Sequence, residues 1–314
     1  MTPPIANPAN VPARTRRRQK SRPLLRIALV AALLASALFA LPTVVEAVRG
    51  LPQVANSLQG PSSAGGQVAL SGLEQGACMI FGHGSKTVFV DAGHGGLDPG
   101  VVGESGGRPL NEKDVTLAVA TRLAPLLQSD GYRVVLSRTR DSSVTKLSVD
   151  DSVSGSLTAS GEHRDLVTRA ACANAAAASV MLSIHFDAFD DPSVGGTETL
   201  YDDARPFSSA NKRLAIDVQS ALVSALGTAD RGVWPDDQMG TPALTPEGNS
   251  YGHLVLLGPA EPGYVDNPSR MPGALVEPLF LTNPTDAQLA GSPAGQQRIA
   301  VALKQGLEKY LAGS

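Results

Sequence analysis

Two histidines in this 314-residue chain come at the ends of short apolar runs and have small neighbours. His94 lies in the run Ala-Gly-His-Gly-Gly, and His185 directly follows Val-Met-Leu-Ser-Ile. Imidazole is a common ligand of divalent metals, and small neighbours leave room for a metal ion and a substrate. A lone histidine in such a place is more often structural, but two at successive strand ends favour a metal site.

Two glutamates add the acidic groups that metal-dependent hydrolysis requires. Glu112 falls in the first turn of a helix expected after the His94 loop, where its alternative role is to stabilise the helix dipole by about 0.3–1 kcal/mol. Glu277 lies in an apolar run, where a buried carboxylate is costly unless it is paired or functional. A zinc hydrolase needs about three protein ligands, an open position for water and a nearby base. The two histidines and two glutamates can supply such a set.

The predicted elements bring three of these residues to one edge of a sheet. Strand-length apolar runs alternate with helical segments, which predicts an α/β fold: a single three-layer domain with a mostly parallel twisted sheet flanked by helices. Ligands bind beyond the carboxyl ends of such strands, so one crevice is expected to hold His94, His185 and Glu277. The expected strands cover residues 87–90, 132–137, 180–184 and 274–277, and the expected helices cover 111–128, 164–178, 209–226 and 297–311.

Two stretches between these elements are irregular. Residues 141–161 form an excursion rich in Ser and Asp, and residues 232–272 are dense in Gly, Pro, Asp and Asn. Long irregular segments in compact domains are usually functional or mobile. Because the second stretch precedes Glu277, we expect it to border the crevice.

The N-terminal part of the chain has the layout of an export signal. Residues 1–26 are expected to be a basic cytoplasmic n-region, and residues 27–47 a signal peptide or a single membrane anchor. Residues 48–85, rich in Gly, Ser, Pro and Gln, are expected to be a flexible linker to a folded domain over residues 86–314. After position 47 the chain holds 19 basic and 28 acidic residues, which excludes nucleic acid as a partner because the net negative charge repels phosphate.

Cysteine occurs only twice, as Cys78 and Cys172. In an exported protein such a pair can form one disulfide, and a bridge closing so long a loop adds about 4–5 kcal/mol in the chain-entropy model. The alternative is two small buried thiols, which are common in protein cores. Sequence alone leaves both readings open.

Four separated motifs, covering about residues 87–312, resemble the zinc-dependent N-acetylmuramoyl-L-alanine amidases of the amidase-3 type. Val-Phe-Val-Asp-Ala-Gly-His94-Gly-Gly resembles the first metal motif, and Asn-Glu112-Lys-Asp the second. Arg169, followed by Ala-Asn and then Ser-Ile-His185, resembles the third. Pro-Gly-Ala-Leu-Val-Glu277 resembles the strand with the catalytic glutamate. The order of the motifs also follows the family.

The resemblance implies that His94, Glu112 and His185 bind one Zn2+ per chain and that Glu277 is the catalytic acid/base. It implies a peptidoglycan hydrolase that cleaves the amide bond between N-acetylmuramic acid and the L-alanine of the stem peptide by zinc-activated water. An exported monomer acting on peptidoglycan or muropeptides is expected, secreted or anchored in the periplasmic or cell-wall space. The alternatives are a zinc peptidase acting within the stem peptide and a non-catalytic wall-binding regulator.

Two departures from the family pattern concern the expected pocket wall and no ligand. Phe186-Asp187 replaces a small residue and Asn after the third ligand, and Pro278-Leu279 replaces a Gly-Phe-type continuation. His83 and His163 lack ligand-like neighbours and are expected to be solvated. His253 could orient substrate but is not counted among the site residues.

Overall fold

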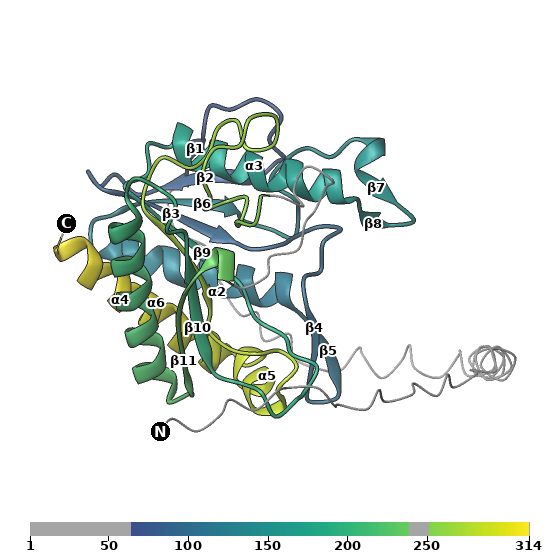
Figure 1. Cartoon of the computed structure of the whole chain (residues 1–314), viewed down its shortest axis with the longest axis vertical. Coiled ribbons are helices and arrows are strands. Elements are labelled where there is room, and N and C mark those ends of the chain that lie inside the picture. Colours follow the sequence, from purple (N-terminus) through teal and green to yellow (C-terminus); the bar gives the residue numbers. More distant parts are fainter. Residues whose placement is uncertain (1–63, 239–250, 314) are drawn as a thin grey trace, which may run out of the picture. The chain divides into compact units, whose positions relative to one another are not determined.

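The fold is known from a computed structural model, which describes residues 64–238 and 251–313. Within this part, a mixed eight-stranded sheet is covered by helices on both faces (Figure 1). The strand order is β1-β2-β6-β3-β9-β12-β10-β11. The strands of this sheet are β1 (Ala64–Gln67), β2 (Ala77–Phe81), β3 (Thr87–Ala92), β6 (Arg133–Arg138), β9 (Val180–Ile184), β10 (Thr197–Tyr201), β11 (Asp230–Pro235) and β12 (Gly273–Glu277).

The centre of the sheet is parallel, as the strand and helix alternation predicts. β6, β3, β9 and β12 are neighbours and run in the same direction, and β11 is parallel to β10. The antiparallel pairs are β1 with β2, β2 with β6, and β10 with β12. Parallel strands need crossover connections, and helices supply them. The helices are α2 (Glu112–Ser129), α3 (Ala159–Ala175), α4 (Ser208–Leu226), α5 (Pro284–Ala290) and α6 (Pro293–Ala312).

The helices form two layers because the central strands are apolar on both faces. Val88 and Val90 of β3 belong to the core cluster shared with α2, α4 and α6. Phe89, between them, belongs to the cluster shared with Cys172 of α3 on the opposite face. All of these side chains are fully buried, and burying a Val or Phe contributes about 1.5–3 kcal/mol. The expected three-layer α/β domain is therefore confirmed.

Smaller elements surround the carboxyl edge of the central strands. Two hairpins lie there, on the right in Figure 1. They are β4 (Val102–Ser105) with β5 (Arg108–Asn111), and β7 (Ser152–Val153) with β8 (Ser156–Leu157). The second hairpin follows the 3-10 turn η1 (Val149–Asp151), so the 141–161 excursion carries short elements of its own. A second 3-10 turn, η2 (Asp236–Gln238), follows β11.

The expected linker over residues 48–85 is wrong for its second half. β1 and β2 extend the main sheet, and β2 pairs with β6 through Met79 opposite Leu136. Cys78 in β2 forms a disulfide with Cys172 in α3, which decides between the two readings of the cysteines. The Gly- and Ser-rich composition hides a strand of only five residues, whose stability comes from its neighbours. Residues 48–63 lie outside the described part of the chain.

Helix starts differ from the expectation where local capping decides them. α3 begins at Ala159 rather than Arg164, because the Thr158 side chain accepts a hydrogen bond from Gly161 N and caps the helix one turn earlier. Asn111 occupies the N-cap position of α2 but makes no capping bond, and its side chain donates to Asp114.

Among residues 64–238 and 251–313, no helix combines the length and the apolar character that a membrane span requires. The predicted basic segment 1–26 and the predicted signal or anchor segment 27–47 lie outside the described residues.

Candidate metal centre and active site

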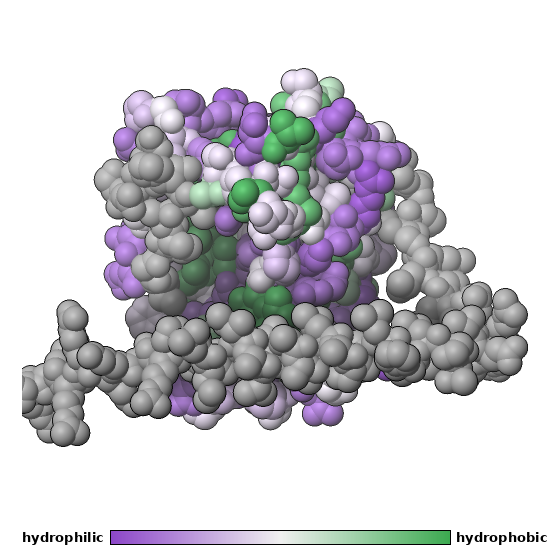
Figure 2. All heavy atoms as spheres, turned by 90° about the vertical axis from the view of Figure 1, so that its right-hand side faces the viewer, coloured by the Kyte–Doolittle hydropathy of each residue, from purple (hydrophilic) through white to green (hydrophobic). Residues whose placement is uncertain are grey.

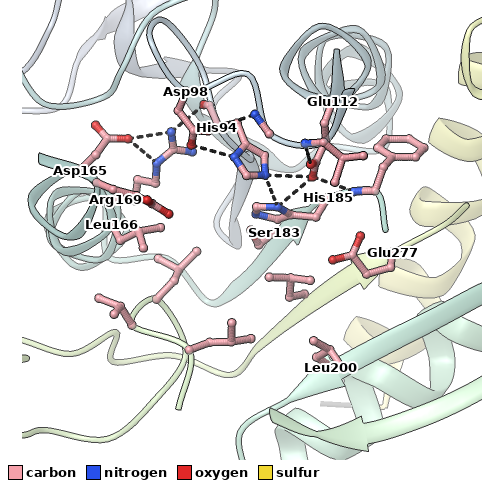
Figure 3. A pocket seen from close by; sticks show the side chains of 18 of the residues that line it. His94, Asp98, Glu112, Asp165, Leu166, Arg169, Ser183, His185, Leu200 and Glu277 are labelled. Atoms are coloured by element: carbon pink, nitrogen blue, oxygen red, sulfur yellow. Dashed lines mark hydrogen bonds and ion pairs between the residues drawn. The ribbon is translucent and has the colours of Figure 1, made fainter. Parts of the chain in front are cut away.

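Three side chains predicted from the sequence converge at the carboxyl edge of the sheet (Figure 3). His94 follows β3, His185 follows β9, and Glu112 opens α2. His94 Nε2 lies 3.0 Å from Glu112 Oε1 and 3.0 Å from His185 Nδ1, and His185 Nδ1 lies 3.1 Å from Glu112 Oε1. Three donors of this kind can hold a metal ion.

Asp98 fixes the orientation of the His94 ring. Its Oδ2 lies 2.7 Å from His94 Nδ1, so a proton on Nδ1 is directed at the carboxylate. That leaves Nε2 facing Glu112 and His185. His94 itself has a backbone φ of 60°, in the left-handed region that glycine favours, so tertiary contacts must hold the loop. Burial lowers the pKa of His94, but hydrogen bonds to Asp98 and Glu112 outweigh it and raise the pKa to about 10.

Glu112 is buried and is held by two backbone amides. Val101 N donates to Oε2 and Phe186 N donates to Oε1, each at 2.8 Å. Burial opposes the charged form, but hydrogen bonds from His185 and His94 lower the pKa of this carboxyl below its usual range. The glutamate is thus a fixed, ionised carboxylate that faces the two histidines, rather than a helix-dipole partner at the surface.

A buried arginine supports the His94 loop from below. Arg169 of α3 donates to Asp91 Oδ1 at 2.7 Å and to the His94 carbonyl oxygen at 2.8 Å. Asp165, one turn earlier in α3, lies 2.8 Å from the same guanidinium. Ser183 of β9 donates to the other oxygen of Asp91 at 2.7 Å. This network ties β3, β9 and α3 together next to both histidines.

Glu277 ends β12, the strand beside β9, and its carboxylate faces the same pocket (Figure 3). Its Oε2 atom is buried and makes no hydrogen bond to any described residue. Burial raises the pKa of Glu277 well above its usual value, and the negative charges of Glu112, Asp187 and Glu198 raise it further. A carboxyl group with a raised pKa and an open hydrogen-bonding site is suited to accept and return a proton.

The pocket around these residues has a volume of about 680 Å³. One wall is apolar and includes Leu200 and Leu275 from the sheet with Leu166 from α3. Residues of the irregular segment 251–272 line it as well, which confirms the predicted border for the described part of 232–272. In the space-filling view of the side with the two hairpins, hydrophobic side chains show in a recess among polar ones (Figure 2).

Only one of the two departures from the family pattern lies at the pocket. Phe186 and Asp187 line it, whereas Pro278 and Leu279 do not. Asp187 and Glu198, both acidic and close to Glu277, raise the negative charge of this side. Burial and a hydrogen bond with Glu198 raise the pKa of Asp187 to about 7.

Sequence reasoning missed three residues that act on this site. Asp98 was read only as part of a glycine-rich loop, although its spacing of four residues from His94 is a usable signal for a supporting carboxylate. Glu198 and its ion-pair partner Arg231 come from β10 and β11, which the sequence pattern did not reveal. Of the other histidines, His83 is exposed and His163 stacks on Tyr264 with ring centroids 4.2 Å apart.

Three clustered metal-binding donors, with a carboxylate beside them in a pocket at the carboxyl edge of an α/β sheet, have the arrangement of a metal-dependent hydrolase. The sequence matches the amidase-3 family, described as N-acetylmuramoyl-L-alanine amidase, over residues 88–309. The chain therefore belongs to this family of peptidoglycan hydrolases.

Individual relatives agree with this assignment. The uncharacterised protein YqiI of Bacillus subtilis (strain 168) is 34% identical over 72% of this chain and 84% of its own length. The N-acetylmuramoyl-L-alanine amidase LytC of the same strain is 33% identical over 72% of this chain, which spans only 35% of LytC. The crystal structure of N-acetylmuramoyl-L-alanine amidase from Clostridium difficile 630 has a TM-score of 0.52 and 29% identity, covering 74% of this chain and 100% of that one.

Proposed function

We propose that this chain hydrolyses the amide bond between N-acetylmuramic acid and the L-alanine of the stem peptide, with one Zn2+ held by His94, Glu112 and His185. The observation that carries the proposal is the triangle of donors with sides of 3.0, 3.0 and 3.1 Å. Ligands of tetrahedral zinc lie roughly 3.3 Å apart, so a small movement of the side chains accommodates the ion.

The donor set favours zinc over calcium and magnesium. Two imidazole nitrogens and one carboxylate oxygen are a ligand set found in catalytic zinc sites, where three protein ligands leave a position open. Calcium and magnesium prefer sites made of six or more oxygen ligands. The backbone bonds to Glu112 and the bond from Asp98 to His94 hold the donors in place for such an ion.

Glu277 is the proposed acid/base. When bound, Zn2+ supplies positive charge that polarises the amide carbonyl and lowers the pKa of water and of carboxyl groups nearby. Glu277 Oε2, which is buried without a partner in the described structure, accepts a proton from the attacking water and returns it to the leaving amine. Its place at the end of β12 puts it on a rigid strand beside the strand that leads to His185.

Export of the chain is part of the proposal, because peptidoglycan lies outside the cytoplasmic membrane. The basic run and apolar segment over residues 1–47 support it. The disulfide between Cys78 and Cys172 supports it too, since disulfides persist in oxidising compartments. Mass spectrometry of the N-terminus of the mature protein distinguishes a cleaved signal from a retained anchor.

Product analysis of digested peptidoglycan tests the activity. Free, intact stem peptides that begin with L-alanine are expected, and activity is expected to disappear with a chelator and return with Zn2+. Fragments cut within the stem peptide would indicate a zinc peptidase instead. Absence of any released peptide from the zinc-loaded protein would indicate a non-catalytic wall-binding protein.

A further inference from the structure

A second cluster of metal-binding side chains lies at the opposite edge of the sheet from the first, because β10 and β11 run antiparallel to β12. Asp202 directly follows β10, and Asp236 directly follows β11. β10 and β11 are parallel neighbours, so their carboxyl ends bring the two carboxylates together (Figure 1). His253, from the segment that lines the pocket, completes the cluster.

The three side chains are close enough to share one ion. His253 Nδ1 lies 3.0 Å from Asp202 Oδ2 and 3.2 Å from Asp236 Oδ1. One donor atom from each residue lies within 4.8 Å of the other two. Both aspartates are completely buried, so bulk water does not solvate their charges.

One carboxylate oxygen of each aspartate already accepts a hydrogen bond from a backbone amide. Arg205 N donates to Asp202 Oδ1 at 2.9 Å, and Leu254 N donates to Asp236 Oδ2 at 2.8 Å. These bonds turn the remaining oxygens, Asp202 Oδ2 and Asp236 Oδ1, toward His253. They fix the carboxylates as supporting hydrogen bonds fix metal ligands elsewhere.

The hydrogen bonding of Asp202 Oδ2 indicates that this cluster binds a cation. It is buried, and its neighbour His253 Nδ1, which carries at most one proton, is hydrogen-bonded to Asp236 Oδ1, so Asp202 Oδ2 receives no hydrogen bond from the described residues. The guanidinium of Arg205 forms no ion pair with this oxygen and donates instead to the carbonyl oxygens of Gly258 and Ser269. A buried carboxylate oxygen without a donor is costly, and a bound cation removes that cost.

We propose that Asp202, Asp236 and His253 bind a second Zn2+ per chain. An imidazole nitrogen and two carboxylate oxygens are zinc ligands, and donor separations of 3.0 and 3.2 Å are close to the roughly 3.3 Å of a tetrahedral site. Three donors are too few for calcium, and the nitrogen disfavours magnesium. None of the three residues belongs to the proposed catalytic centre, so this inference does not depend on the proposed function.

The position of His253 in a segment that lines the pocket indicates the role of this ion. His253 lines the catalytic pocket together with Tyr251 and Leu254, whereas the two aspartates lie behind that wall. Zinc at this cluster therefore ties the pocket wall to the ends of β10 and β11. The ion is structural, with no place for substrate at the aspartates.

Zinc counting on the full-length chain, purified in detergent without a histidine tag, tests the proposal. After removal of all metal, the protein is dialysed against buffered Zn2+ and its metal content is measured by mass spectrometry. The unmodified chain is expected to bind about two equivalents, and Asp202→Asn or His253→Gln about one. The matched controls Asp203→Asn and Asp237→Asn alter exposed neighbours and are expected to keep both ions. If the unmodified chain binds only one equivalent of Zn2+ and Asp202→Asn still binds that equivalent, the proposal is overturned.

A second variant leaves the new cluster intact and removes the catalytic one. The double substitution His94→Ala and His185→Ala is expected to retain about one equivalent of Zn2+, and Co2+ in its place is expected to give the visible absorption of a nitrogen- and oxygen-ligated ion. Retention of no metal by this double variant, with an unchanged circular dichroism spectrum, contradicts the second site. If the catalytic centre is wrong instead, the double variant binds as much zinc as the unmodified chain, and Asp202→Asn still lowers the count.

Discussion

Glu198 of β10 and Glu277 of β12 lie directly opposite each other on neighbouring antiparallel strands. Side chains in such a pair share one face of the sheet, and like charges there repel. The repulsion contributes to the raised pKa of Glu277, after the larger effect of burial. Arg231 Nε, 2.9 Å from Glu198 Oε2, forms an ion pair with Glu198 beside the proposed base.

Glu198→Gln is therefore expected to shift the pH dependence of the reaction. Removing a negative charge favours the ionised form of Glu277, which lowers its pKa and makes the base available at lower pH. The acidic limb of the kcat/KM profile should move to lower pH. Glu104→Gln, an exposed change on β4, should leave the profile where it is. An acidic limb that stays in place in Glu198→Gln would remove Glu198 from this role.

Glu277→Gln keeps the shape of the side chain but cannot accept the proton. Activity on peptidoglycan is expected to fall by about 10²–10⁴-fold, the usual contribution of general acid–base catalysis. Zinc content should not change, because Glu277 is not one of the three proposed ligands. Measuring turnover and bound zinc on the same sample separates the two effects, and full turnover by the variant would refute the assignment.

The central strands and the four candidate residues could be predicted because their signals are local. Buried runs such as Val180–Ile184 are apolar on both faces, and His185 stands next to one of them. β2 could not be predicted, since a five-residue strand among glycines gains its stability from β6 and from the bridge to Cys172.

Clusters that are built from distant loops also could not be predicted from local sequence patterns. His253 lies in a Pro- and Gly-rich segment, and the sequence does not indicate which residues accompany it. Its partners, Asp202 and Asp236, follow β10 and β11, and only the pairing of these two strands brings them together. Asp98 differs, because it lies four residues from His94 and belongs to the same loop.

Gly93→Ala tests whether the ring of His185 must keep its place. A Cβ atom at Gly93 would lie 2.4 Å from His185 Nε2, far closer than real contacts allow, so the ring has to move. Displacing a ligand by about 1 Å can cost about 100-fold in rate, and a loss of this size is expected for peptidoglycan hydrolysis. Gly66→Ala is the matched control, because nothing lies within 4 Å of its Cβ position. Equal activity of both variants would show that the site tolerates the shift.

Asp98→Ala tests the support of His94. Without the carboxylate that holds Nδ1, the ring loses its orientation, and zinc affinity is expected to fall about 10–100-fold. Competition with a chromogenic chelator measures the change. Asp141→Ala is the control within the same loop region: Asp141 accepts from Gly96 N and Lys113 but contacts no ligand. A loss of affinity as large in the control would mean that loop position, not ring orientation, decides binding.

The disulfide between Cys78 and Cys172 is expected to stabilise the domain without taking part in the reaction. It closes a loop with a sequence separation of 94 residues, and the chain-entropy model assigns such a bridge about 4–5 kcal/mol. Replacing both cysteines with alanine should lower the free energy of unfolding by about 2–5 kcal/mol, as measured by urea denaturation. Neither cysteine lines the pocket, so activity well below the melting temperature should be unchanged. The unmodified protein under reducing conditions should match the double variant, and equal stability of the oxidised and reduced forms would show that packing alone fastens β2 to α3.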